Sequence, residues 1–143
     1  MKTKTDLINA WLDKADKDLL SSEHELSLPH QNTITETVCF HCQQAAEKYL
    51  KAYLVFLGIS FKKTHEIGKL ITMCEKKDKD ISALKEESDK LTDYAVDIRY
   101  PDEFAVPTLD EAEEALEIAK NVKGFVLERI GEQNSQQSGL QPQ

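Results

Sequence analysis

The chain has 143 residues and a formal net charge of −8 at pH 7, with 40% hydrophobic and 31% charged residues. This size predicts one domain with a core of its own, and the negative charge opposes non-specific nucleic-acid binding over the whole surface. No apolar run approaches the roughly 20 residues of a membrane-spanning helix, and the N-terminal residues lack the apolar stretch of a signal peptide, so we expect a cytoplasmic protein.

The first predicted helix covers roughly residues 5–27. Its apolar stripe has helical spacing and consists of Ile8, Trp11, Leu12, Ala15, Leu19 and Leu26. Trp11 is expected to be largely buried in the core. Pro29 then bars continuation of the helix. Thr33 followed by Glu36 has the spacing of a capping box, which predicts the start of the second helix.

The second predicted helix, residues 35–57, is expected to be the centre of the fold. Its apolar residues recur at steps of three and four. The segment from Ala52 to Leu57 is apolar almost all the way round, so more than one neighbouring helix has to cover it. Gly58 is a natural stop because glycine accepts the left-handed conformation that often follows a helix. We therefore predict that this helix is the central post of a bundle.

A short helix and a long helix are predicted next. Thr64 has the character of an N-cap for a short helix over residues 65–77. Gly68 inside that helix costs about 1 kcal/mol relative to alanine, which indicates close packing at this position. The long helix is predicted over residues 81–99, and Pro101 ends it because proline disfavours helical backbone at the preceding residue.

The last predicted helix begins after Thr108, which forms a second capping box with Glu111, and closes at Gly131. Residues 132–143 contain almost no apolar side chains, so we expect a disordered tail after a helical domain of residues 1–131. No segment alternates convincingly between apolar and polar residues. The fold class is therefore predicted as all-α, an up-and-down antiparallel bundle of four long helices plus one short helix.

Four segments of the sequence together resemble the HEPN domain family (higher eukaryotes and prokaryotes nucleotide-binding), in its stand-alone prokaryotic type. In chain order these segments are WLDKADKDL, CFHCQQAAEKYLKAYL, KTHEIGKL and IRYPDE. The resemblance implies a five-helix bundle that commonly forms homodimers. It also implies a minimal nucleotidyltransferase as partner in toxin–antitoxin-like modules, and binding of a nucleotide such as ATP or GTP, as in the eukaryotic relative at the end of sacsin.

Many members of this family are metal-independent ribonucleases with an arginine followed four to six positions later by a histidine. The imidazole can move the 2′-hydroxyl proton, and the guanidinium can stabilise the phosphorane charge. Arg99 matches the arginine, but residues 100–106 contain no histidine. We therefore predict a non-enzymatic module that needs no cofactor. The alternatives are a ribonuclease in which His65 or His41 serves beside Arg99, with RNA as substrate, and a purely structural assembly domain.

Residues 43–69 form a locally positive stretch, with five lysines against two glutamates. Solvated helix faces would explain this charge, but a phosphate-binding patch is the sharper hypothesis. Backbone N–H groups at the start of the short helix could bind an anion there, and a guanidinium could grip a phosphate with two hydrogen bonds. The candidate nucleotide-binding residues are Lys62, Lys63, Thr64, His65, Arg99, Tyr100, His41 and Lys48.

Each candidate also has an ordinary structural explanation. Arg99 could pair with an acid or bond the last carbonyls of its helix, and Tyr100 could cover the core. The imidazole of His65 could bond a neighbouring helix. His41 and Lys48 could line a polar groove with Gln44, but we favour a hydrogen-bonded seam between helices for His41 and solvent exposure for Lys48.

The three cysteines of the chain, Cys39, Cys42 and Cys74, lack the spacing of a disulfide framework, and this favours a reducing compartment. Cys39, His41 and Cys42 suggest zinc, but His41 points elsewhere on a helix and structural zinc sites use tighter knuckles. We predict buried thiols and no metal.

The central helix and the loop after Pro101 have more apolar surface than a single small bundle needs to bury, and this favours a symmetric dimer. The aromatic residues behind this prediction are Tyr49, Tyr53, Phe56, Phe61 and Phe104.

Overall fold

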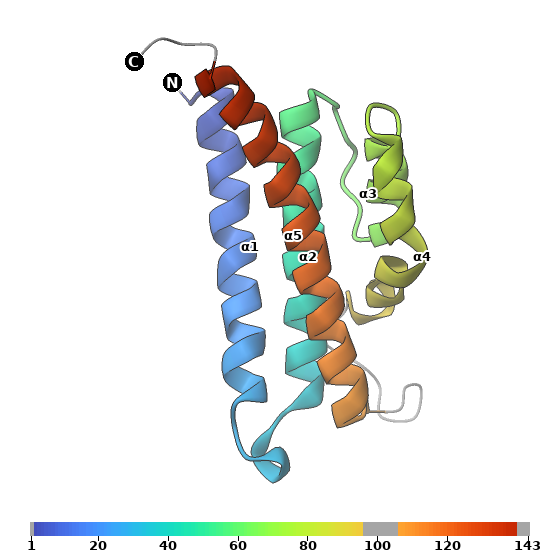
Figure 1. Ribbon diagram of the computed structural model, residues 1–143. Helices are drawn as coiled ribbons and strands as arrows, with labels where there is room; N and C mark the ends of the chain where they lie inside the picture. Colours follow the sequence, from blue (N-terminus) through green and yellow to red (C-terminus); the bar gives the residue numbers. More distant parts are fainter. Residues whose placement is uncertain (1, 96–105, 140–143) are drawn as a thin grey trace.

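The computed structural model describes residues 2–95 and 106–139, without the side chains of residues 132–139. Three long helices lie side by side: α1 (Lys4–Leu26), α2 (Thr35–Leu57) and α5 (Leu109–Gly139) (Figure 1). The short helix α3 (Ile67–Cys74) and α4 (Lys85–Ser88) lie on the other side of α2 from α1. The described residues contain no strand, so the all-α prediction is confirmed.

Helix α2 has the predicted bounds and the predicted place. Gly58 follows it in the left-handed conformation, with a φ of 73°, and its N–H donates to the carbonyl groups of Leu54 and Val55. α1, α3, α5 and the 3₁₀ helix η3 (Asp89–Tyr94) all pack against α2. Its largest fully buried side chains are those of Tyr49, Leu50 and Leu54. Several neighbours cover the helix, as expected because its C-terminal segment is apolar nearly all the way round.

The first two helices differ from expectation at two points. Trp11 is only half-buried, and the ammonium group of Lys51 lies 5.4 Å from the centre of its ring. The capping box of Thr33 and Glu36 does not form, because α2 begins one residue later than this spacing predicts, and the Thr33 hydroxyl lies within hydrogen-bond distance of carbonyl groups of Glu25, Leu28 and Pro29. Ile34 is the N-cap of α2 instead, and its N–H donates to Glu25 Oε2 at 3.0 Å.

Up to residue 95, the predicted fourth long helix is broken into three short pieces, and its predicted end at residue 99 lies outside the described residues. The pieces are the 3₁₀ helix η2 (Lys79–Leu84), α4 and η3. The tighter turns of η3 bring Asp89 and Thr92 to the start of α3, where both side chains accept hydrogen bonds from backbone N–H groups. Asp89 fills the space beside Gly68: a Cβ at Gly68 would lie 2.8 Å from Asp89 Oδ1, so close packing there is confirmed.

Helix α5 begins with the predicted capping box. Thr108 N donates to Glu111 Oε1 at 2.9 Å, and Glu111 N donates to Thr108 Oγ1 at 3.1 Å. The helix does not close at Gly131 as predicted but continues to Gly139. Gly131 has no left-handed backbone, and Gly58 alone among the described residues has a positive φ. The disordered tail stays a prediction.

Two aromatic residues behind the dimer hypothesis belong to the core instead of the surface. Tyr49 and Tyr53 are buried, and their hydroxyl groups donate to Asp16 and Asp78. Phe56 is half-buried and stacks against Tyr53. Within the part of the chain that the structure describes, no helix is long and apolar enough to cross a membrane.

Candidate functional site

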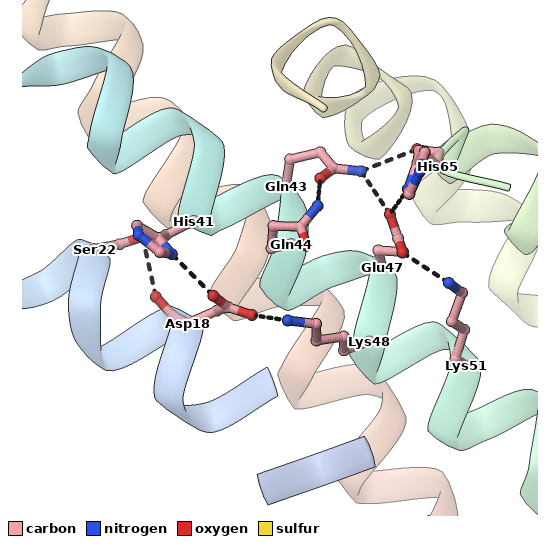
Figure 2. Close-up of polar contacts among 9 residues, drawn as sticks. All are labelled: Asp18, Ser22, His41, Gln43, Gln44, Glu47, Lys48, Lys51 and His65. Carbon is pink, nitrogen blue, oxygen red and sulfur yellow. Dashed lines mark hydrogen bonds and ion pairs between the residues drawn. The ribbon is translucent and has the colours of Figure 1, made fainter. Parts of the chain in front are cut away.

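Helix α2 carries two clusters of polar side chains, and Figure 2 shows the helix running between them. We call the first the His65 cluster, made of Gln43, Glu47, Lys51 and His65. We call the second the Asp18 seam, made of Asp18, Ser22, His41 and Lys48. The chain thus separates the two candidate histidines, which do not share one site.

In the His65 cluster a buried carboxylate holds an exposed imidazole. Glu47 Oε1 lies 2.9 Å from His65 Nδ1, and Glu47 Oε2 accepts a hydrogen bond from Lys51 Nζ at 2.7 Å. The side chain of Glu47 is 5% exposed, whereas that of His65 is 55% exposed. The prediction that the His65 imidazole could bond a neighbouring helix is confirmed, and its partner is Glu47.

Gln43 forms hydrogen bonds both to Glu47, the partner of the His65 ring, and to the backbone of His65. Its Nε2 donates to Glu47 Oε1 at 3.1 Å and to the carbonyl oxygen of His65 at 2.9 Å. Its own Oε1 accepts from Gln44 Nε2 at 2.7 Å. Gln43, Glu47 and Lys51 stand four residues apart, so they form one row along α2. The connector 58–66 is therefore tied to the central helix at His65.

The charge of Glu47 follows from this environment. Burial alone would raise the pKa of Glu47, but hydrogen bonds from Lys51, His65 and Gln43 outweigh burial and lower that pKa below its usual value. The carboxylate is therefore ionised at neutral pH. Because a carboxylate only accepts hydrogen bonds, Nδ1 of His65 must carry the ring hydrogen that lies between them.

Of the five lysines in the positive stretch 43–69, only Lys62 and Lys63 lack an ion pair with another described residue. Lys48 and Lys51 are paired with carboxylates of the two clusters, and Lys69 pairs with Glu66 at 2.8 Å. Lys62 and Lys63 are exposed, and neither forms an ion pair with another described residue. Side chains that can attract an anion remain at this end of the connector.

The backbone anion site expected at the start of α3 is absent from the described residues. The helix begins at Ile67, not at His65, and the Thr64 hydroxyl accepts from the N–H of Glu66 at 3.1 Å. The N–H of Ile67 donates to Thr92, and that of Gly68 donates to Asp89. Since the protein's own side chains already use these donors, a phosphate here would have to be bound by side chains.

The Asp18 seam joins α1 to α2. His41 Nδ1 lies 2.9 Å from Asp18 Oδ1, which confirms the seam predicted for His41. Lys48 bonds the other oxygen of Asp18, and its side chain is only 22% exposed, so the predicted exposure of Lys48 is wrong. Ser22 Oγ completes the seam by donating to the carbonyl of Val38 at 3.1 Å. These groups satisfy one another between two packed helices, which is a structural role.

The remaining candidates divide into two groups. Arg99 and Tyr100 lie outside the described residues. The three cysteines are buried, as predicted, and form no disulfide, and burial raises the pKa of Cys42 and of Cys74 to about 12. No group of three metal-ligating side chains converges within the described residues.

The sequence-based reasoning missed Gln43, Glu47 and Asp18. Their polar side chains stand next to apolar positions of helices, and the four-residue spacing of Gln43, Glu47 and Lys51 was the available signal.

With this geometry in place, the chain can be compared with known proteins. The model of the HEPN domain matches residues 8–130. The chain belongs to the HEPN family. Its fold is similar to the crystal structure of TT1696 from the bacterium Thermus thermophilus, with a TM-score of 0.68 and 30% identity over 85% of this chain and 96% of that chain.

A second solved structure has a similar fold. ST0689, described as an archaeal HEPN homologue, has a TM-score of 0.68 and 27% identity over 91% of this chain and 99% of that chain. No curated protein matches the chain. The resemblance of the four sequence segments to this family is thereby confirmed.

Proposed function

We propose that this HEPN protein is a binding module and not an enzyme. In this proposal it forms homodimers, works with a minimal nucleotidyltransferase in a toxin–antitoxin-like pair, and binds the phosphate groups of a nucleotide beside His65. Membership of the HEPN family supports the proposed nucleotidyltransferase partner. Nucleotide binding is supported by one observation of the structure, the exposed imidazole of His65 that a buried carboxylate holds next to two lysines without ion pairs among the described residues.

The chemistry of this position suits a phosphate group. Lys62 and Lys63 are exposed, and ammonium groups attract phosphate oxygens as point charges. The side chains of Lys48 and Lys51 are held by Asp18 and Glu47, so they are not available to a ligand in the same way. A weak, salt-sensitive site is expected because the lysines are at the surface, where ions screen their charge.

Isothermal titration calorimetry with ATP and GTP tests nucleotide binding. The double variant Lys62→Ala/Lys63→Ala should weaken binding by about tenfold or more, since charged hydrogen bonds contribute roughly 1.5–3 kcal/mol each. The matched control is Lys14→Ala/Lys79→Ala, because both residues are exposed and neither has an ion pair with another described residue. Equal losses in the two double variants would show a general effect of net charge and contradict the assigned site.

Dimerisation is supported by exposed aliphatic side chains at one end of the bundle. Ile34 is 55% exposed and Val106 is 63% exposed. They are neighbours of Thr35 and Pro107, which are joined by a hydrogen bond of 2.7 Å from Thr35 Oγ1 to the Pro107 carbonyl. Two large aliphatic groups at one place on the surface suit an interface better than isolated ones would.

A ribonuclease is the second candidate function, and one observation favours it. The pairing of Glu47 with His65 Nδ1 is the arrangement that orients a histidine as a general base. His65 would then take the place of the histidine that is missing after Arg99. Cleavage of a short single-stranded RNA by the wild type, abolished in both His65→Ala and Arg99→Ala but kept in His41→Ala, would establish this function and overturn the binding-module proposal.

A purely structural assembly domain is the third outcome of these experiments. It would show neither heat with ATP or GTP nor RNA cleavage, and it would still form dimers.

A further inference from the structure

One nitrogen of the His65 ring bonds to Glu47, and more than half of the side chain is exposed to solvent. Nδ1 faces the ionised carboxylate of Glu47 at 2.9 Å and carries the ring hydrogen, while 55% of the side chain is exposed. Nε2 has no hydrogen-bond partner among the described residues. In the neutral ring Nε2 therefore offers a lone pair, and it becomes an N–H donor only when a proton is added.

We infer that His65 binds a phosphate group only as an imidazolium, so that ligand binding is coupled to the presence of a proton on Nε2. The unprotonated oxygens of a phosphate group are acceptors only, and they cannot bond a nitrogen that presents a lone pair. The protonated ring supplies both an N–H donor and a positive charge, while Glu47 stays bonded to Nδ1 in either state. This inference rests on the proposed function and adds to it a coupling between nucleotide binding and pH.

The charges around His65 are compatible with this coupling. They are Glu47 and Lys51 on α2, Lys62, Lys63 and Glu66 beside it in the chain, and Asp89 of η3, which caps α3. Lys51 is bonded to Glu47 and balances that carboxylate, and Glu66 is paired with Lys69. A bound phosphate adds negative charge next to the ring, and this favours the charged imidazole over the neutral one.

The tautomer of His65 in the free protein provides a first test that needs no ligand. Long-range ¹H–¹⁵N NMR at high pH should show the hydrogen on Nδ1 and a bare Nε2. A neutral ring with its hydrogen on Nε2 would overturn the inference.

Proton uptake on binding is the second test. Calorimetry of ATP and of tripolyphosphate should be run at pH 7 in buffers of different ionisation enthalpy, with wild type, His65→Gln and the control His30→Gln. His30 is an exposed histidine of the 3₁₀ helix η1 (His30–Asn32). Because a phosphate group itself titrates near pH 6, the decisive quantity is the difference in proton uptake between wild type and His65→Gln.

The expected result is greater proton uptake in wild type and His30→Gln than in His65→Gln, for ATP and for tripolyphosphate alike. Affinity should fall by up to about tenfold per pH unit as the ring loses its proton. Equal uptake in wild type and His65→Gln would overturn this inference and leave nucleotide binding intact. Binding of neither ligand would overturn the proposed function together with it.

Discussion

Replacing Glu47 by glutamine tests the buried ion pair at the centre of the His65 cluster. The variant keeps the size of the side chain but leaves the ammonium group of Lys51, whose side chain is only 8% exposed, without its carboxylate. Breaking one partner of a buried pair costs about 3–5 kcal/mol, a large part of the roughly 5–15 kcal/mol that stabilises a typical domain. We expect a loss of this size, partly relieved by the Trp11 ring 5.4 Å from Lys51 Nζ.

Urea unfolding followed by circular dichroism measures the effect. With a slope of about 1–3 kcal/mol per molar urea, the midpoint of Glu47→Gln should fall by roughly 1–5 M, whereas Glu66→Gln should leave it unchanged because the Glu66–Lys69 pair is exposed. The double variant Glu47→Gln/Lys51→Met should recover most of the loss, since it removes both charges. A midpoint for Glu47→Gln equal to that of Glu66→Gln would refute the buried pair.

The pH dependence of the same experiment has a definite sign. The folded-state pKa of Glu47 is lowered, so its contribution to stability is present above the unfolded glutamate pKa of about 4.3 and is lost as the pH falls through the folded value. The difference in unfolding free energy between wild type and Glu47→Gln should therefore be constant from pH 5 to 7 and shrink in more acidic solution. A difference that grows on acidification would contradict this assignment.

Three further predictions concern assembly, thiols and the C-terminal residues. Ile34→Glu/Val106→Glu should convert a dimer into a monomer by light scattering, while Leu20→Glu on α1, where Leu20 is 50% exposed, should not; a monomeric wild type at tens of micromolar would contradict the dimer. The buried thiols should react with a maleimide at pH 8 far more slowly than in urea, since burial raises the pKa of Cys42 to about 12, and equal rates would contradict that burial. Deletion of residues 132–143 should change the melting temperature by no more than about two degrees, and a larger drop, by the usual few degrees per kcal/mol, would show that this segment packs on the bundle.

The features of the fold that were predicted correctly depend on interactions between residues close together in the sequence. α2 has its predicted bounds because its apolar spacing and the left-handed Gly58 act within the helix itself. The capping box of Thr108 and Glu111 formed because both groups lie within one helical turn. The box of Thr33 and Glu36 has the same spacing but did not form, because Ile34 and not Thr33 is the N-cap of α2.

The site was less predictable because its hydrogen bonds and ion pairs join residues that are far apart in the sequence. His65 and Glu47 are separated by 18 positions, and Asp18 and Lys48 by 30. Asp89 reaches Gly68 across 21 positions and uses the N–H that was expected to bind an anion. Sequence spacing identified His65 as a candidate, but only the packed helices show which carboxylate holds it and which lysines remain available.

In the proposed function, a nucleotide binds beside His65 and not at the Asp18 seam. Amide and histidine-ring NMR signals followed during titration with ATP test it most directly, because both clusters are observed in one experiment. We expect chemical-shift changes concentrated at Lys62, Lys63 and His65, and unchanged signals for His41 and Lys48. Shifts centred on His41 and Lys48, or none at saturating ATP, would contradict it.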